Sequence, residues 1–111
     1  MELKVNQHPR GVLIEVSGDI DTLTAPELQS CLNGTLREEP LVFVMDMTDV
    51  RYISSMGLRV FLSHLKRVKA NNGSMVIAGA SKLVNDVFKM SGFSSYFEMI
   101  ASSEDVISRL Q

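Results

Sequence analysis

A continuous apolar run followed by an amphipathic helical pattern constrains the fold of this chain more than any other feature. The run Leu41-Val-Phe-Val-Met45 is short and rich in β-forming residues, which is typical of a central strand covered on both faces. Beyond it, apolar residues recur at three- and four-residue steps, namely Leu58, Phe61, Leu62, Leu65 and Val68. We therefore expect a buried strand that leads into a helix with one apolar face.

Shorter patterns predict four further strands. Residues 2–7 and 12–16 indicate an antiparallel hairpin at the start of the chain, because turn residues separate two β-rich runs. Residues 75–78 form another short apolar run, and residues 96–100 are a candidate final strand. The polar residues expected to end the central strand are Asp46, Thr48 and Asp49.

Three more helices are expected in addition to the amphipathic one. The first begins near Thr24, since Thr24-x-x-Glu27 has the spacing of a capping box. The others cover residues 81–90 and 103–110, and Asn71-Asn72-Gly73 should end the amphipathic helix. The inner stripe of the first helix would be Leu28, Cys31, Leu32 and Leu36.

Strands that alternate with helices predict an α/β fold with a mostly parallel sheet. We expect a mixed sheet of four to five strands, an N-terminal antiparallel hairpin and about four helices. No linker or repeat divides the sequence, and its 111 residues suit one core. Residues 1–111 are therefore predicted to form a single domain.

Composition excludes several classes of function. The chain has 13 acidic and 11 basic side chains and a formal charge of -2, whereas a sequence-independent nucleic-acid binder usually has a strong basic excess. Its longest apolar run is far below the roughly 20 residues that span a bilayer. The N-terminus lacks the apolar segment of a signal peptide. We expect a soluble cytoplasmic protein that binds neither nucleic acid nor membranes.

The chain also has little catalytic equipment. His8 and His64 have no metal-ligating neighbour at helical spacing, and Cys31 is expected to be a small core residue. The phosphate-binding glycine loops and the HExxH zinc motif are absent. We therefore predict no catalytic residue, no cofactor and no metal site.

The segment Tyr52-Ile-Ser-Ser-Met-Gly-Leu-Arg59 links the buried strand to the amphipathic helix. Functional loops of open α/β sheets usually follow the carboxyl ends of strands. A serine at the start of this helix has two possible roles. It could cap the helix by accepting an amide hydrogen bond, or it could be phosphorylated, because free helix amides can receive phosphate oxygens.

Charge is unevenly distributed along the chain. Residues 11–49 contain eight acidic side chains and one basic, whereas residues 50–70 contain five basic side chains and no acidic one. Asp19 and Asp21 are expected in the loop before the first helix, close to residues 54–57. A phosphate there would be repelled by these carboxylates and would alter a docking surface.

Two segments resemble the signature segments of the STAS-domain anti-sigma factor antagonists. They are Gly18-Asp-Ile-Asp-Thr-Leu-Thr-Ala-Pro-Glu-Leu28 and Asp46-Met-Thr-Asp-Val-Arg-Tyr-Ile-Ser-Ser-Met-Gly-Leu-Arg-Val-Phe-Leu62. Phe88-Lys-Met-Ser-Gly-Phe93 is similar to the end of the family's third helix. The resemblance covers nearly the whole chain and implies the STAS fold.

The resemblance further implies a bacterial partner-switching protein that is not an enzyme. In this family the unphosphorylated antagonist binds and sequesters an anti-sigma factor, which is also a serine kinase with a histidine-kinase-like ATPase fold. Phosphorylation of one serine ends the binding, and a metal-dependent serine phosphatase restores it. The family's acceptor lies two positions before the Gly-Leu pair and is here Ser55, with Ser54 as the second candidate. A monomer is expected.

The implied partner-binding residues come from both signature segments: Asp21, Thr24, Ser54, Ser55, Met56, Gly57 and Arg59. Asp21 could equally be a local turn or capping residue. The Ser55 hydroxyl could cap the helix when unmodified, and a phosphate could later use the same amides. Met56 stands where the family commonly has serine or alanine, and it would either contact the partner or fill a gap.

Two other functions remain open for a chain with this resemblance. One is a STAS-type module that senses a small molecule or nucleotide. The other is a partner switch whose output is not a sigma factor.

Overall fold

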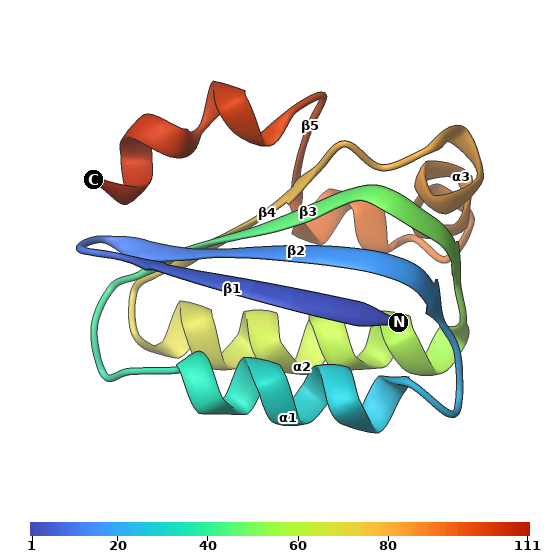
Figure 1. Cartoon of the computed structure of the whole chain (residues 1–111), viewed down its shortest axis with the longest axis horizontal. Coiled ribbons are helices and arrows are strands. Elements are labelled where there is room, and N and C mark those ends of the chain that lie inside the picture. Colours follow the sequence, from blue (N-terminus) through green and yellow to red (C-terminus); the bar gives the residue numbers. More distant parts are fainter.

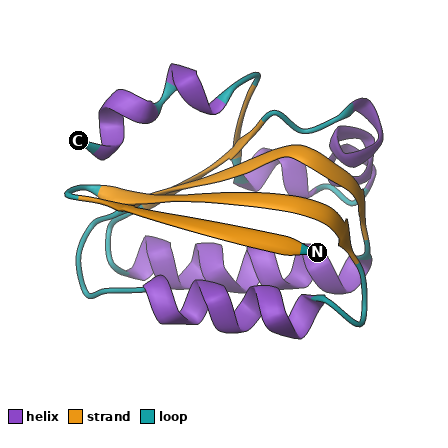
Figure 2. Cartoon of the chain, in the orientation of Figure 1, coloured by secondary structure: helices purple, strands orange, loops and turns teal.

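A five-stranded sheet forms the centre of the molecule in the computed structural model, which describes all residues, 1–111. The helices α1 and α2 lie side by side against one face of the sheet, and the C-terminal turns lie on the other (Figure 1, Figure 2). The elements in chain order are β1 (Glu2–His8), β2 (Gly11–Ile20), α1 (Ala25–Thr35), β3 (Val42–Ile53), α2 (Ser55–Ala70), β4 (Ser74–Ala78), α3 (Lys82–Met90), η1 (Phe93–Tyr96), β5 (Glu98–Ile100), η2 (Ser103–Asp105) and η3 (Ile107–Leu110).

The strand order β1-β2-β3-β4-β5 confirms the predicted mixed sheet. β1 pairs with β2 antiparallel, with His8 opposite Gly11, which is the expected hairpin. β2 to β5 are all parallel to one another. Because parallel strands need crossover connections, α1, α2 and α3 are placed between successive strands.

The prediction that polar residues after Met45 end the central strand is wrong, since β3 continues to Ile53. Its pairing with β2 shifts register twice, between Glu15 and Ser17 and between Gly18 and Asp19. At each shift β3 contains one residue more than β2, as in a β-bulge, which lets a strand carry polar residues without ending. The spacing of the core-facing side chains of β3 therefore changes from two residues to three after Met47. These side chains are Phe43, Met45, Met47, Val50 and Ile53.

The C-terminal segment also differs from the prediction. Residues 103–110 form two 3-10 turns, η2 and η3, so the chain has three α-helices rather than about four. Val106, between the turns, has φ -125° and ψ 0°, which is not a helical conformation. Val106 and Leu110 are buried and cover the second face of the sheet. The conformation of this segment is therefore set by the burial of Val106 and Leu110 rather than by one continuous helix.

Two apolar clusters cover the two faces of the sheet, as the central apolar run predicted. The larger cluster lies between the sheet and α1, α2 and α3, with Ile14, Phe43 and Phe61 fully buried. The smaller cluster consists of Leu13, Val44, Val76, Ala78, Val106 and Leu110. Both faces of the central strands are therefore excluded from water.

The expected inner stripe of α1 is only partly buried. Leu28 and Leu32 are fully buried, whereas Leu36 and Cys31 are half-buried. Burial and the neighbouring carboxylate of Glu27 raise the pKa of the Cys31 thiol. Cys31 is thus at the edge of the core, and its thiol is less readily ionised than an ordinary cysteine.

His64 lies on the core side of α2 and is fully buried. Its ring packs edge-on against Phe43, with 4.5 Å between the ring centroids. Neither ring nitrogen has a hydrogen-bond partner. Burial, followed by the positive charge of Arg67, lowers the pKa of His64 from 6.5 to about 4.

We expect His64 to destabilise the folded protein as the pH falls from 6.5 toward 4. The unfolded chain binds a proton at this side chain near pH 6.5, but the folded chain does so only near pH 4. This residue's contribution is therefore fully present above pH 6.5, and about 3 kcal/mol is lost by pH 4. Urea unfolding of the wild type and His64→Leu at pH 7 and pH 4 measures it. An equal loss of stability in both proteins would contradict the prediction.

Candidate functional site

The loops that follow β2 and β3 meet at one edge of the sheet, at the right of Figure 1. Ile20 and Ile53 are paired at the carboxyl ends of these parallel strands. The backbone N–H of Ser54 donates a 2.7 Å hydrogen bond to the carbonyl oxygen of Ile20. The start of α2 is therefore hydrogen-bonded to the last residue of β2, directly before the loop that leads into α1.

Ser54, not Ser55, caps α2. Its backbone is extended (φ -87°, ψ 171°), and its Oγ accepts a 3.2 Å hydrogen bond from the N–H of Gly57. Ser55 is the first helical residue; its side chain is exposed and makes no side-chain hydrogen bond. The suggestion that the Ser55 hydroxyl caps the helix is thus wrong, because the cap position precedes the first helical residue.

Ser54→Ala is expected to lower the free energy of unfolding by about 1 kcal/mol, because the Gly57 amide loses its capping acceptor. Ser54→Asn supplies another side-chain oxygen and should recover most of that loss. Ser55→Ala is the matched control and should leave stability unchanged. Urea denaturation compares the four proteins. A loss in Ser55→Ala equal to that in Ser54→Ala would contradict the assignment of the cap.

Gly57 allows α2 to approach the end of β2 closely. A Cβ atom at this position would lie 2.6 Å from Cγ2 of Ile20 and 2.9 Å from Cγ1 of Ile53. Both distances are shorter than real Cβ contacts. Gly57, a predicted partner-binding residue, is itself buried. It therefore affects the site by letting α2 lie close to β2 and not by contacting a partner at the surface.

The loop before α1 is held by hydrogen bonds between Asp21 and Thr24. One oxygen of the Asp21 carboxylate, Oδ1, accepts from the N–H groups of Leu23 and Thr24, at 2.9 and 3.0 Å. Thr24 Oγ1 accepts from the N–H of Asp21 and donates to the carbonyl oxygen of Asp19, both at 2.9 Å. Hydrogen bonds to Thr24 and Leu23 lower the pKa of Asp21, the backbone N–H of Thr24 contributing most.

This network corrects the predicted capping box at Thr24-x-x-Glu27. Thr24 is the N-cap residue of α1, but its side chain makes no capping hydrogen bond. Its hydroxyl is already engaged by Asp19 and Asp21, upstream of the helix. Asp21 therefore has the local structural role that the sequence left open, and it shapes the surface beside Ser54.

Exposed apolar side chains surround these loops. Leu23 is 89% exposed, Tyr52 46% and Met56 39%. Nη1 of Arg59 lies 3.9 Å from the sulfur of Met56. Met56 is thus not filling a gap in the core. Sequence reasoning did not select Leu23 or Tyr52, although an apolar residue between two threonines in a turn was a signal for Leu23.

The expectation that Asp19 and Asp21 lie in the loop before α1, close to residues 54–57, holds for Asp21, which directly follows the residue that accepts a hydrogen bond from the N–H of Ser54. Asp21 lies in the loop, but Asp19 belongs to β2, opposite Tyr52. The carboxylate of Asp19 pairs with Arg51, with 3.4 Å between Oδ1 and Nε. Asp21 has no ion-pair partner within 4.0 Å. Asp21 and Glu27, in the first turn of α1, are therefore carboxylates without an ion pair near the start of the helix.

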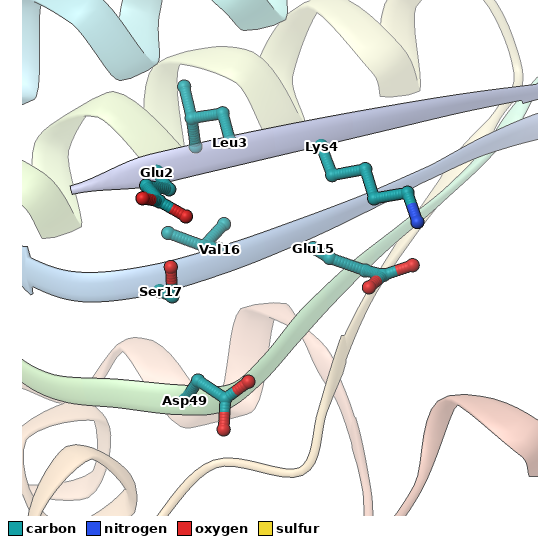
Figure 3. A pocket seen from close by; sticks show the side chains of 7 residues that line it. All are labelled: Glu2, Leu3, Lys4, Glu15, Val16, Ser17 and Asp49. Atoms are coloured by element: carbon teal, nitrogen blue, oxygen red, sulfur yellow. The ribbon is translucent and has the colours of Figure 1, made fainter.

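Other parts of the surface offer less chemistry. One hollow has a volume of about 190 Å³. Its side chains come from β1, β2 and β3 (Figure 3), and none belongs to the loop of Asp21 or to the first turn of α2. No group of three His, Cys, Asp or Glu side chains is placed to hold a metal ion. None of the helices combines the length and the apolar character needed to cross a membrane. The loops at the ends of β2 and β3 remain the best candidate site.

Comparison with known proteins gives a family match over nearly the whole chain. The model of the STAS domain matches residues 2–106. The anti-sigma-B factor antagonist of Listeria monocytogenes is 33% identical over 86 residues, which cover 78% of this chain and 75% of the relative. That of Bacillus subtilis is 29% identical over 104 residues, covering 94% of each chain.

A solved structure gives the same result for the fold. The anti-sigma factor antagonist SpoIIAA in its unphosphorylated form superposes with a TM-score of 0.83 at 19% identity. The match covers 97% of this chain and 95% of that one. The arrangement of sheet and helices described above is therefore shared with this protein.

Proposed function

This chain belongs to the STAS domain family, and on that premise we propose that it is an anti-sigma factor antagonist controlled by phosphorylation of Ser55. The observation that supports the proposal most directly is the exposure of the Ser55 side chain. Its side chain is exposed and makes no side-chain hydrogen bond, while the adjacent Ser54 caps the helix. A kinase could therefore modify Ser55 without removing a contact that holds the fold.

The proposed docking surface combines the two loops with the first turn of α2. Asp21 and Thr24 hold one loop through the four hydrogen bonds described above. Ser54 and Gly57 fix the start of α2 against β2. Ser55, Met56 and Arg59 are exposed and supply the contacts with the partner. A surface held by its own hydrogen bonds loses little conformational entropy when it binds.

The proposed partner is an anti-sigma factor that is also a serine kinase with a histidine-kinase-like ATPase fold. The unphosphorylated chain would bind and sequester this partner. Phosphorylation would end this binding. In that step the Ser55 oxygen takes the γ-phosphoryl group of ATP, ADP leaves, and the hydroxyl proton passes to a base of the kinase. A metal-dependent serine phosphatase would hydrolyse the phosphate and restore the docking surface.

Phosphorylation is expected to change the docking surface more than the fold. A phosphate adds about -1.5 to -2 charges at the start of α2, whose Ser54 is hydrogen-bonded to Ile20, the residue before Asp21, on a chain whose formal charge is -2. The positive end of the α2 dipole lies at the same place and can accommodate those charges. Amide NMR shifts of the two forms should differ in the two loops and the first turn of α2. Widespread shifts through β1 to β5 would contradict this mechanism.

Phosphate mapping tests the proposal directly. The protein is incubated with ATP and candidate serine kinases encoded nearby, and the modified residue is identified by mass spectrometry. We expect modification at Ser55 that is lost in Ser55→Ala and retained in Ser54→Ala, the matched control. Modification at Ser54, or at a serine outside α2, would overturn the assignment of the acceptor.

Residues 1–111 would act as one STAS domain, as a cytoplasmic monomer that moves between kinase and phosphatase. The chain would serve as substrate and ligand, with no catalytic activity of its own. The curated relatives are anti-sigma-B factor antagonists, which supports a sigma factor as the output.

A further inference from the structure

An apolar groove lies between α2 and η1, toward the opposite end of α2 from Ser55. It has a volume of about 490 Å³ and is lined by Leu62, Leu65, Lys66, Lys69, Phe93 and Tyr96. The rings of Phe93 and Tyr96 are tilted by 60°, with 6.3 Å between their centroids. Tyr96 is 59% exposed. Two aromatic rings are thus accessible beside the aliphatic side chains of a helix.

The basic side chains at this groove have no acidic partner. α2 contains Arg59, Lys66, Arg67 and Lys69 but no acidic residue, and none of the four cations takes part in an ion pair. Lys66 and Lys69 are exposed where they line the groove. The helix dipole favours cations near a C-terminus, but it gives no reason for an aromatic pair beside them.

We propose that this groove binds an acidic peptide segment of a second partner protein. An aromatic or branched aliphatic side chain of the segment would lie among Phe93, Tyr96 and the leucines of α2. Carboxylates on either side of it would contact the ammonium groups of Lys66 and Lys69. Aromatic side chains and unpaired charges of one sign are the features that give an interface affinity and specificity, respectively.

The groove is separate from the surface proposed to bind the kinase. Along α2 the groove begins at Leu62, seven residues after Ser55, and extends to Lys69, which corresponds to about 10 to 21 Å from Ser55 along a helix. None of the residues that line the groove belongs to the loops of Asp21 or Ser54. The inference therefore rests on residues other than those proposed to bind the kinase, and it does not depend on phosphorylation of Ser55.

Selection from a displayed library of random dodecamer peptides, with the full chain as bait, tests the inference. Enriched peptides should combine Asp or Glu with an aromatic or branched aliphatic residue. The affinity of the best peptide is then measured by fluorescence anisotropy. Lys66→Glu and Tyr96→Ala should each weaken it about tenfold or more. Lys82→Glu, the same charge reversal on α3, should leave it unchanged, and so should Ser55→Asp.

NMR shift mapping of the bound peptide should locate it at residues 62–69 and 93–96. The inference is overturned if no peptide is enriched, if the enriched peptides lack acidic residues, or if the shifts map to residues 54–57. It is also overturned if the chain binds phosphatidylserine vesicles through Lys66 and Lys69 but binds no peptide. Kinase binding by Lys66→Glu should equal that of the wild type.

Discussion

Ser55→Asp is expected to bind the anti-sigma factor at least about 30-fold more weakly than the unphosphorylated wild type. Ser55 is exposed at the first turn of α2, in the centre of the proposed docking surface. A carboxylate there adds a charge that the partner's surface, complementary to a neutral hydroxyl, would have to desolvate. Such a mismatch costs about 2 kcal/mol or more at an interface, which corresponds to that factor.

The design of this experiment separates lost docking from lost folding. Binding is measured by isothermal titration calorimetry with the purified kinase, and the melting temperature of each variant is measured alongside. Ser55→Asp should melt close to the wild type, because the Ser55 side chain makes no hydrogen bond and a negative charge suits a helix N-terminus. Ser55→Ala should bind in the presence of ATP. Equal affinities of Ser55→Asp and Ser55→Ala would contradict the switch.

Phe61→Ala is expected to lower the free energy of unfolding by about 3–5 kcal/mol. Phe61 is fully buried on the inner face of α2, and its ring stacks on Phe88 of α3, with 6.1 Å between the centroids. Phe88 in turn packs edge-on against Phe97 at 5.6 Å. Removing the first ring leaves a cavity where α2, α3 and the sheet meet, in a domain whose total stability is only of order 10 kcal/mol.

Urea denaturation measures this effect, with two variants for comparison. Phe61→Leu fills part of the cavity and should lose less stability than Phe61→Ala. Leu62→Ala is the matched control on the neighbouring, half-buried position, and it should cost less than either core change because part of its side chain is already in water. A loss below about 1 kcal/mol for Phe61→Ala would show that this aromatic contact does not hold the helices to the sheet.

The order and type of most elements could be predicted from local patterns. The hairpin, the buried strands and the long amphipathic helix were each marked by several residues of matching periodicity. The predicted stop of α2 at Asn71 is confirmed, and Asn72 there has φ 63°, which asparagine tolerates well. Local propensity and burial act in the same direction in these segments, so the sequence suffices.

The predicted ends of secondary-structure elements were wrong where the residues that pair with them are distant in the chain. Asp46 and Thr48 have local turn chemistry, yet pairing with β2 keeps them in β3 through two register shifts. The helix predicted for residues 103–110 was wrong for a similar reason, because Val106 and Leu110 pack on the second face of the sheet. Contacts between residues far apart in sequence outweighed the local signals there.

The sequence by itself determined the α/β class, the family resemblance and the choice of a serine before Gly57 as the functional candidate. Only the tertiary structure decided which serine caps the helix and which is free. That distinction depends on the 2.7 Å hydrogen bond from Ser54 to Ile20, which joins residues 34 positions apart and sets the backbone geometry of the cap. No local pattern contains this contact. It arises only when β2 and β3 lie side by side.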